Sequence, residues 1–93
     1  MLTYDEIING LKNLPGWTFQ ENYIEKTFTF KNFSEGIEFV NKIAEKAESL
    51  NHHPDILIFS YNKVKIKIFT HSAGGVTEKD LKLANQIENI DIK

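Results

Sequence analysis

Apolar residues recur along the chain with two different periods, and these periods predict its secondary structure. Near the start, four aliphatic residues follow helical spacing after Thr3, which forms a capping-box pattern with Glu6. Pro15-Gly16 is expected to stop this helix. The alternation that follows predicts a hairpin of two strands, over residues 17–20 and 23–31.

The longest helical pattern begins after Asn32, which forms a second capping signal with Glu35. This helix must end before Pro54, because proline disfavours the helical conformation at His53. Its predicted apolar stripe is Phe33, Ile37, Val40, Ala44 and Ala47, widened by Phe39, Ile43 and Leu50.

The second half of the chain predicts another hairpin and a last helix. Residues 56–61 are apolar at nearly every position, as in a strand covered on both faces. Asn62-Lys63 fits a tight turn, and residues 64–70 alternate as in a half-buried strand. Thr77 fits the N-cap of the final helix.

Together these elements predict an α+β fold that forms one domain over residues 1–93. The order is helix, strand, strand, helix, strand, strand, helix, with a four-stranded antiparallel sheet and helices on one face. The strand over residues 56–61 is apolar on both faces, whereas helices on one face of the sheet can cover only one of them. We therefore expect a homodimer or homotetramer, with residues 56–59 as the main contacts.

Composition and charge narrow the function classes. The chain has 41% hydrophobic residues and no cysteine, which excludes disulfides and thiolate metal sites. Its net charge is −2, so we expect no nucleic-acid partner and interpret Lys63, Lys65 and Lys67 as a solvent-facing row. Residues 56–59 form the longest apolar run, too short to span a bilayer, and the N-terminus does not resemble a signal peptide. The expectation is a soluble cytoplasmic domain without a membrane partner.

All three histidines lie in one stretch, where they form the chain's main candidate for chemistry. His52, His53 and His71 are bracketed by the carboxylates of Glu48 and Asp80. Imidazole titrates near neutrality and can both give and take a proton. A reaction that needs an acid and a base together can use two imidazoles in one pocket.

The predicted topology allows these histidines to meet. The turn over residues 51–54 and the end of the strand over residues 64–70 are joined by one hairpin, so their outer ends should lie side by side. If the strand continues to His71, this side chain shares the parity of Lys65 and Lys67 and faces away from the core.

Each residue also has an ordinary structural interpretation. The adjacent histidines fit a turn, His71 a strand terminus and Glu48 a solvated helix face, while Asp80 completes a capping box with Thr77. Zinc is a further alternative, because His, Glu and Asp all ligate it. The chain has neither a His-Glu-x-x-His nor a His-x-His spacing, however. Composition and spacing alone support catalysis and coincidence about equally.

The spacing of these residues resembles the signature of the pterin-4a-carbinolamine dehydratases. The pattern is Glu48-x-x-x-His52-His53-Pro54, then Tyr61 after six residues, His71 after nine and Asp80 after eight. Further similar segments are Gly16-Trp17, Tyr61-Asn62-Lys63-Val64, Thr70-His71, Gly75-x-Thr77-x-x-Asp80 and Leu83-Ala84. The resemblance covers almost the whole chain. The residues between Pro54 and Tyr61 are bulkier and more aliphatic than expected, which bears on oligomer contacts rather than on chemistry.

The resemblance implies dehydration of 4a-hydroxytetrahydropterin to quinonoid dihydropterin, in support of tetrahydrobiopterin recycling. This reaction requires neither a metal nor a redox cofactor. The acid–base set would be His52, His53 and His71, with His53 and His71 as the most direct proton carriers.

The resemblance extends to supporting residues and to a second role. Glu48 and Asp80 would orient the histidines or raise their basicity, and three flanking residues would contact the pterin, partly through backbone groups: Asn51, Thr70 and Ser72. Trp17 would belong to the core rather than line the pocket. Some animal members of the family also act as dimerisation partners of a homeodomain transcription factor, so a non-catalytic interaction module is the alternative function.

Overall fold

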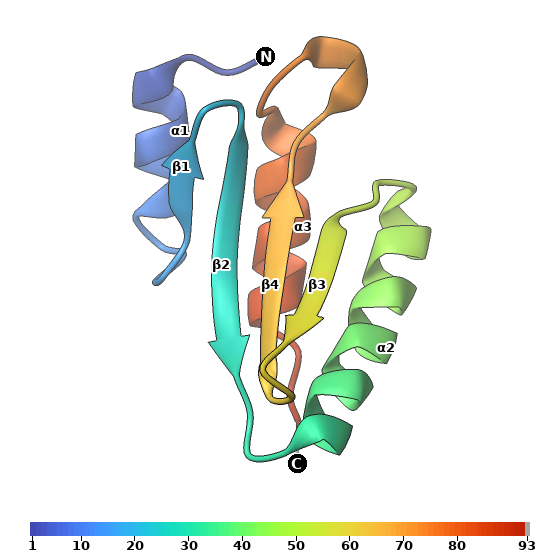
Figure 1. Cartoon of the computed structure of the whole chain (residues 1–93). Helices are drawn as coiled ribbons and strands as arrows, with labels where there is room; N and C mark the ends of the chain where they lie inside the picture. Colours follow the sequence, from blue (N-terminus) through green and yellow to red (C-terminus); the bar gives the residue numbers. More distant parts are fainter. Residues whose placement is uncertain (93) are drawn as a thin grey trace.

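The fold follows the element order expected from the sequence. A computed structural model describes residues 1–92, which form three α-helices, four strands and one short 3₁₀ turn (Figure 1). The elements are α1 (Tyr4–Leu11), β1 (Thr18–Gln20), β2 (Tyr23–Thr29), α2 (Phe33–Leu50), β3 (Asp55–Phe59), β4 (Lys63–Ile68), η1 (His71–Ala73) and α3 (Glu78–Glu88). The predicted α+β class is confirmed.

The four strands form one antiparallel sheet in the order β1-β2-β4-β3, which leaves β3 at an edge. The register places Ile24 of β2 opposite Ile68 of β4, and Phe28 opposite Val64. In Figure 1, α3 runs behind the sheet. Side chains from all three helices join those of β2 and β4 in one core: Ile7, Phe39, Ile43, Leu83 and Ile87 with Ile24, Val64, Ile66 and Ile68. The helices therefore cover a single face.

Strand β4 alternates as its sequence predicts. Val64, Ile66 and Ile68 are fully buried, whereas Lys65 and Lys67 are half-buried on the opposite face. The ammonium group of Lys67 lies 4.5 Å from the centroid of the Tyr23 ring on β2. The lysine row thus belongs to the face of the sheet that the helices leave open. None of the helices in residues 1–92 is long and apolar enough to cross a membrane.

Helix capping follows the sequence signals closely. Thr3 and Glu6 form the predicted capping box of α1. Asn32 caps α2, and its side-chain oxygen accepts a hydrogen bond from the backbone N–H of Glu35 over 2.9 Å. The carboxylate of Glu35 reaches back to the backbone N–H of Lys31.

The predicted apolar stripe of α2 is partly wrong. Phe33 is 52% exposed and Ala44 is also exposed, whereas the buried positions are Gly36, Phe39, Ile43 and Ala47. Two apolar stripes lie side by side on this helix, and a helical period alone does not tell which faces the sheet.

The second hairpin also differs from the expectation. Lys63 begins β4, so the turn covers Ser60, Tyr61 and Asn62 rather than Asn62-Lys63; Ser60 and Tyr61 both have positive φ (48° and 56°). Consecutive residues in the left-handed conformation are typical of a tight hairpin turn. Because the ring of Tyr61 is apolar, the sequence pattern indicated a strand at this position. Ile56 and Leu57 of β3 are 36% and 53% exposed, so a single chain does not cover this strand on both faces.

Candidate active site

The C-terminal end of α2 presents two histidines in succession. Asn51 adopts the left-handed conformation (φ 49°), and its N–H donates to the carbonyl oxygen of Glu48. The N–H of His52 donates to the carbonyl oxygen of Ala47, which completes a Schellman motif. Asparagine tolerates this conformation better than most residues. The chain therefore reverses at Asn51 and brings His52 and His53 to the start of β3.

His71 reaches the same region on a turn rather than on a strand. The strand predicted to continue through Thr70 ends at Ile68, and His71 opens the 3₁₀ turn η1. The carbonyl oxygen of Thr70 accepts hydrogen bonds from Ala73 and Gly74, which hold this turn together. The exposed ring of His71 lies against Phe69, with 4.2 Å between the ring centroids.

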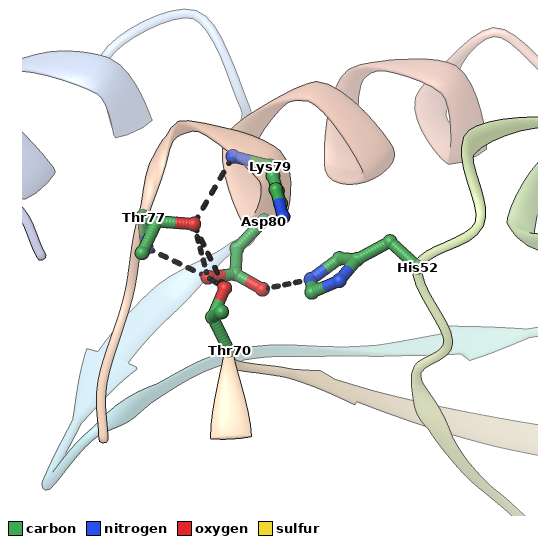
Figure 2. A network of polar contacts seen from close by, with 5 residues as sticks. All are labelled: His52, Thr70, Thr77, Lys79 and Asp80. Atoms are coloured by element: carbon green, nitrogen blue, oxygen red, sulfur yellow. Dashed lines mark hydrogen bonds and ion pairs between the residues drawn. The ribbon is translucent and has the colours of Figure 1, made fainter. Parts of the chain in front are cut away.

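Asp80 connects the start of α3 with His52. Its Oδ2 accepts hydrogen bonds from the backbone N–H of Thr77 (2.7 Å) and from the hydroxyl of Thr70 (2.9 Å), as Figure 2 shows. Its Oδ1 lies 2.5 Å from Nε2 of His52. The carboxylate has no exposed surface, and the His52 side chain is only 12% exposed. Asp80 thus completes the predicted capping box and also holds a histidine.

A second histidine–carboxylate pair lies at the surface. Nε2 of His53 contacts Oε2 of Glu48, one turn back on α2. Both side chains are largely exposed, at 58% and 74%. An exposed pair of this kind adds little to stability, because water and salt screen it. The contact turns Nε2 of the His53 ring towards Glu48.

The three histidines line one hollow of about 460 Å³. This volume lies within the range of about 300–1,000 Å³ that is usual for small-molecule sites. The lining residues are Asn51, His52, His53, Pro54, Asp55, Phe69, Thr70, His71, Ser72 and Lys79. Six of the eight site residues predicted from the sequence are in this list. The other two, Glu48 and Asp80, contact a histidine.

Four lining residues were not foreseen: Pro54, Asp55, Phe69 and Lys79. Phe69 has the same strand parity as His71, and Lys79 is adjacent to Asp80. The sequence positions of both residues therefore indicated that they could lie near the site. A hollow of similar volume shares Thr70, Ser72 and Lys79 with this one, but no histidine lines it. The histidine-lined hollow is therefore the better candidate for acid–base chemistry.

Trp17 belongs to the core, as expected. Its side chain is buried, and its Nε1–H donates to Glu88 on α3 over 2.8 Å. Glu88 also pairs with Lys26 of β2. Among residues 1–92, no three His, Cys, Asp or Glu side chains come together as a metal site.

Comparison with known proteins identifies the family. The family model described as pterin 4 alpha carbinolamine dehydratase matches residues 1–90. The chain belongs to this family. A dehydratase-family relative from Nostoc punctiforme is 53% identical over 90 residues, covering 97% of this chain and 96% of its own. One from Sulfolobus acidocaldarius is 47% identical over 89 residues, covering 96% and 97%. Both carry the name pterin-4-alpha-carbinolamine dehydratase as a provisional assignment.

Two solved structures share this fold, and the first also agrees with the family assignment. A transcriptional coactivator/pterin dehydratase from Brucella melitensis has a TM-score of 0.88 and 38% identity, with 94% of each chain covered. A pterin dehydratase-like protein, described as a RuBisCO assembly factor in the alpha-carboxysome, has a TM-score of 0.62 and 19% identity. That match covers 77% of this chain and 82% of the other, and at this identity it shows the fold alone.

Proposed function

We propose that this member of the pterin carbinolamine dehydratase family dehydrates 4a-hydroxytetrahydropterin to quinonoid dihydropterin. The observation that carries the proposal is the convergence of His52, His53 and His71 on one hollow. Two of these rings are each held by a carboxylate. Such a reaction would support tetrahydrobiopterin recycling.

The chemistry requires two proton transfers at neighbouring atoms. A base takes the proton from N5 of the pterin, and the electron pair forms the N5–C4a double bond. The C4a–O bond breaks, and an acid gives its proton to the departing hydroxyl, which leaves as water. One proton is taken and one is given, so a pair of imidazoles can return to its starting state by exchange with solvent.

We assign the direct proton transfers to His53 and His71. Both are exposed, and they line the hollow from two different segments of the chain, the turn after α2 and the turn η1. Among the described residues, the ring nitrogens of His71 have no hydrogen-bond partner, which leaves both for substrate. His53 uses Nε2 for Glu48 and keeps Nδ1 for the pterin.

The pterin ring would lie among polar groups at the rim of the hollow. Asn51 and Ser72 flank the histidines and offer side-chain and backbone hydrogen bonds to the edge of the ring. Phe69 provides an apolar wall behind His71. These residues would orient the bicycle so that N5 and C4a face the two imidazoles.

We further propose that the protein acts as a homodimer or homotetramer through β3. This strand is at the edge of the sheet, and Ile56 and Leu57 are among the exposed large apolar residues. An exposed apolar edge is a template for pairing with a second chain. Because β3 begins at Asp55, directly after Pro54, and both residues line the hollow, such a partner would adjoin the hollow.

The direct test is dehydration of freshly generated 4a-carbinolamine by the purified protein, followed beside the spontaneous reaction. We expect a clear acceleration that a chelator does not remove. A rate equal to the spontaneous one refutes the proposal, and a rate abolished by the chelator favours a metal-dependent reaction instead.

The second candidate function is a protein-interaction module, supported by the coactivator name of the Brucella relative. The same assay separates the two, because an interaction module need not accelerate the reaction. The name of the Brucella protein joins both descriptions, so activity would leave an additional binding role open to a separate search for partners.

A further inference from the structure

The hydroxyl groups of Thr70 and Thr77 have no direct place in the proposed chemistry, yet both are part of the network around Asp80. We infer that these threonines are positioning residues, which hold Asp80 so that His52 keeps its proton on Nε2 and offers only Nδ1 to substrate. The effect on turnover rests on the proposed function, whereas the position of the proton does not.

The hydrogen bonds of this network have a definite direction. Thr70 has one hydroxyl proton and donates it to Oδ2 of Asp80. The 2.8 Å contact between the hydroxyl oxygens of Thr70 and Thr77 is then donated by Thr77, whose oxygen lies farther, at 3.5 Å, from Oδ2 of Asp80. The hydroxyl oxygen of Thr77 accepts in turn from the backbone N–H of Lys79 over 3.2 Å. The chain of protons thus runs from the start of α3 towards Asp80.

The Asp80 carboxylate meets two donors at Oδ2 and faces His52 at Oδ1. Its Oδ2 accepts from the backbone N–H of Thr77 and from the Thr70 hydroxyl, at the positive end of α3. An ionised carboxylate only accepts hydrogen bonds. Nε2 of His52, 2.5 Å from Oδ1, must consequently be the donor. A neutral His52 then has its lone pair on Nδ1.

The network also gives Thr70 a role other than the pterin contact that the family resemblance implies. Its side chain is 7% exposed, and its hydroxyl is committed to Asp80 and Thr77. Its backbone N–H donates to Gly75, and its carbonyl oxygen accepts from the η1 turn. Thr70 therefore acts on the pterin only through the residues that it holds.

Replacement of Asp80 by its amide gives the sharpest test. The Oδ2 position faces two donors, so in Asp80→Asn the amide oxygen must occupy it and the NH₂ group must face His52. Nε2 of His52 would then accept, and its proton would move to Nδ1. We expect ¹⁵N side-chain NMR to show neutral His52 with the proton on Nε2 in the wild type and on Nδ1 in Asp80→Asn.

Thr70 variants test the threonine contribution with a matched pair. Thr70→Ser keeps the hydroxyl and is expected to retain the wild-type proton position and kcat. Thr70→Val keeps the shape and loses the donor, so we expect both proton positions of His52 to be populated. Turnover is expected to fall roughly 10- to 100-fold through kcat, with KM little changed, because misplacement of a catalytic group has effects of this order. If Thr70→Val does not fold, the Asp80→Asn comparison still decides.

The inference is overturned if wild-type His52 carries its proton on Nδ1, if Asp80→Asn leaves it on Nε2, or if Thr70→Val matches Thr70→Ser in both readouts. A protein without dehydratase activity that shows the expected proton positions would refute the proposed function and leave this inference standing. An active protein that lacks the expected proton positions would support the proposed function and refute this inference.

Discussion

Nε2 of His52 lies 2.5 Å from Oδ1 of Asp80, a carboxylate without exposed surface. This contact joins the C-terminal end of α2 to the first turn of α3. His71 comes from the turn that leads out of β4. The hollow is therefore built where the ends of three elements meet, and His52 is held there by a carboxylate from a different element.

Removal of either exposed imidazole should abolish most of the turnover. We expect His53→Ala and His71→Ala each to lower kcat by about 10²–10⁴-fold, the usual contribution of a general acid or base. Steady-state kinetics on freshly generated carbinolamine measures this loss. Lys82→Ala, an exposed change on α3, is the matched control. Wild-type rates in both histidine variants would show that neither ring transfers a proton.

The two carboxylates should differ in importance because they differ in burial. Glu48 is 74% exposed, whereas Asp80 is fully buried. We expect Glu48→Gln to lower kcat at most about fivefold, in line with the small energy of exposed ion pairs. Asp80→Asn should cost considerably more. Measurement of both variants under one set of conditions checks the order, and equal losses would contradict it.

A charge on the edge strand should interfere with self-association. Leu57→Lys places an ammonium group in the proposed contact, and we expect sedimentation to show a shift from an oligomer to a monomer. Ile8→Lys, at a partly exposed position on α1, is the control and should leave the oligomer intact. A monomeric wild type, or an unchanged oligomer in Leu57→Lys, would refute an interface at β3.

The capping box of α1 makes a pH-dependent contribution to stability. Hydrogen bonds from the backbone N–H and then the hydroxyl of Thr3 lower the pKa of Glu6 from its usual value of 4.5. Because the folded-state pKa is the lower one, the stabilisation is complete above the unfolded value and is lost as pH falls through the folded value.

Thermal unfolding of Glu6→Gln checks this contribution. The melting temperature of the variant should lie below that of the wild type at neutral pH, and the difference should shrink at an acidic pH below the folded-state pKa of Glu6, where both states bind the proton. A difference that is the same at both pH values would mean that the charge of Glu6 does not stabilise the cap.

The sequence was most informative where a local signal has one structural outcome. The capping boxes at Thr3 and Thr77 each formed, because a hydroxyl and a carboxylate three residues apart satisfy the free N–H groups at a helix start. The alternation of β4 likewise placed Val64, Ile66 and Ile68 in the core. The family resemblance implied eight site residues, and six of them line one hollow.

Other features depended on tertiary contacts that no local pattern carries. Phe33 and Phe39 are both apolar and both on α2, and only the position of the sheet decides that Phe39 is buried. The partner of Thr70 was missed for a similar reason. A hydroxyl beside a predicted site suggests a ligand contact, whereas the fold brings the buried Asp80 within hydrogen-bonding distance.

The most direct measurement compares wild type and the double variant His53→Ala/His71→Ala in a single dehydration assay with freshly generated 4a-carbinolamine. We expect the wild type to accelerate the loss of water and the double variant to fall to the spontaneous rate, with the fold of both confirmed by circular dichroism. A wild type no faster than solvent, or a double variant as fast as the wild type, would contradict the central claim that these imidazoles perform the reaction.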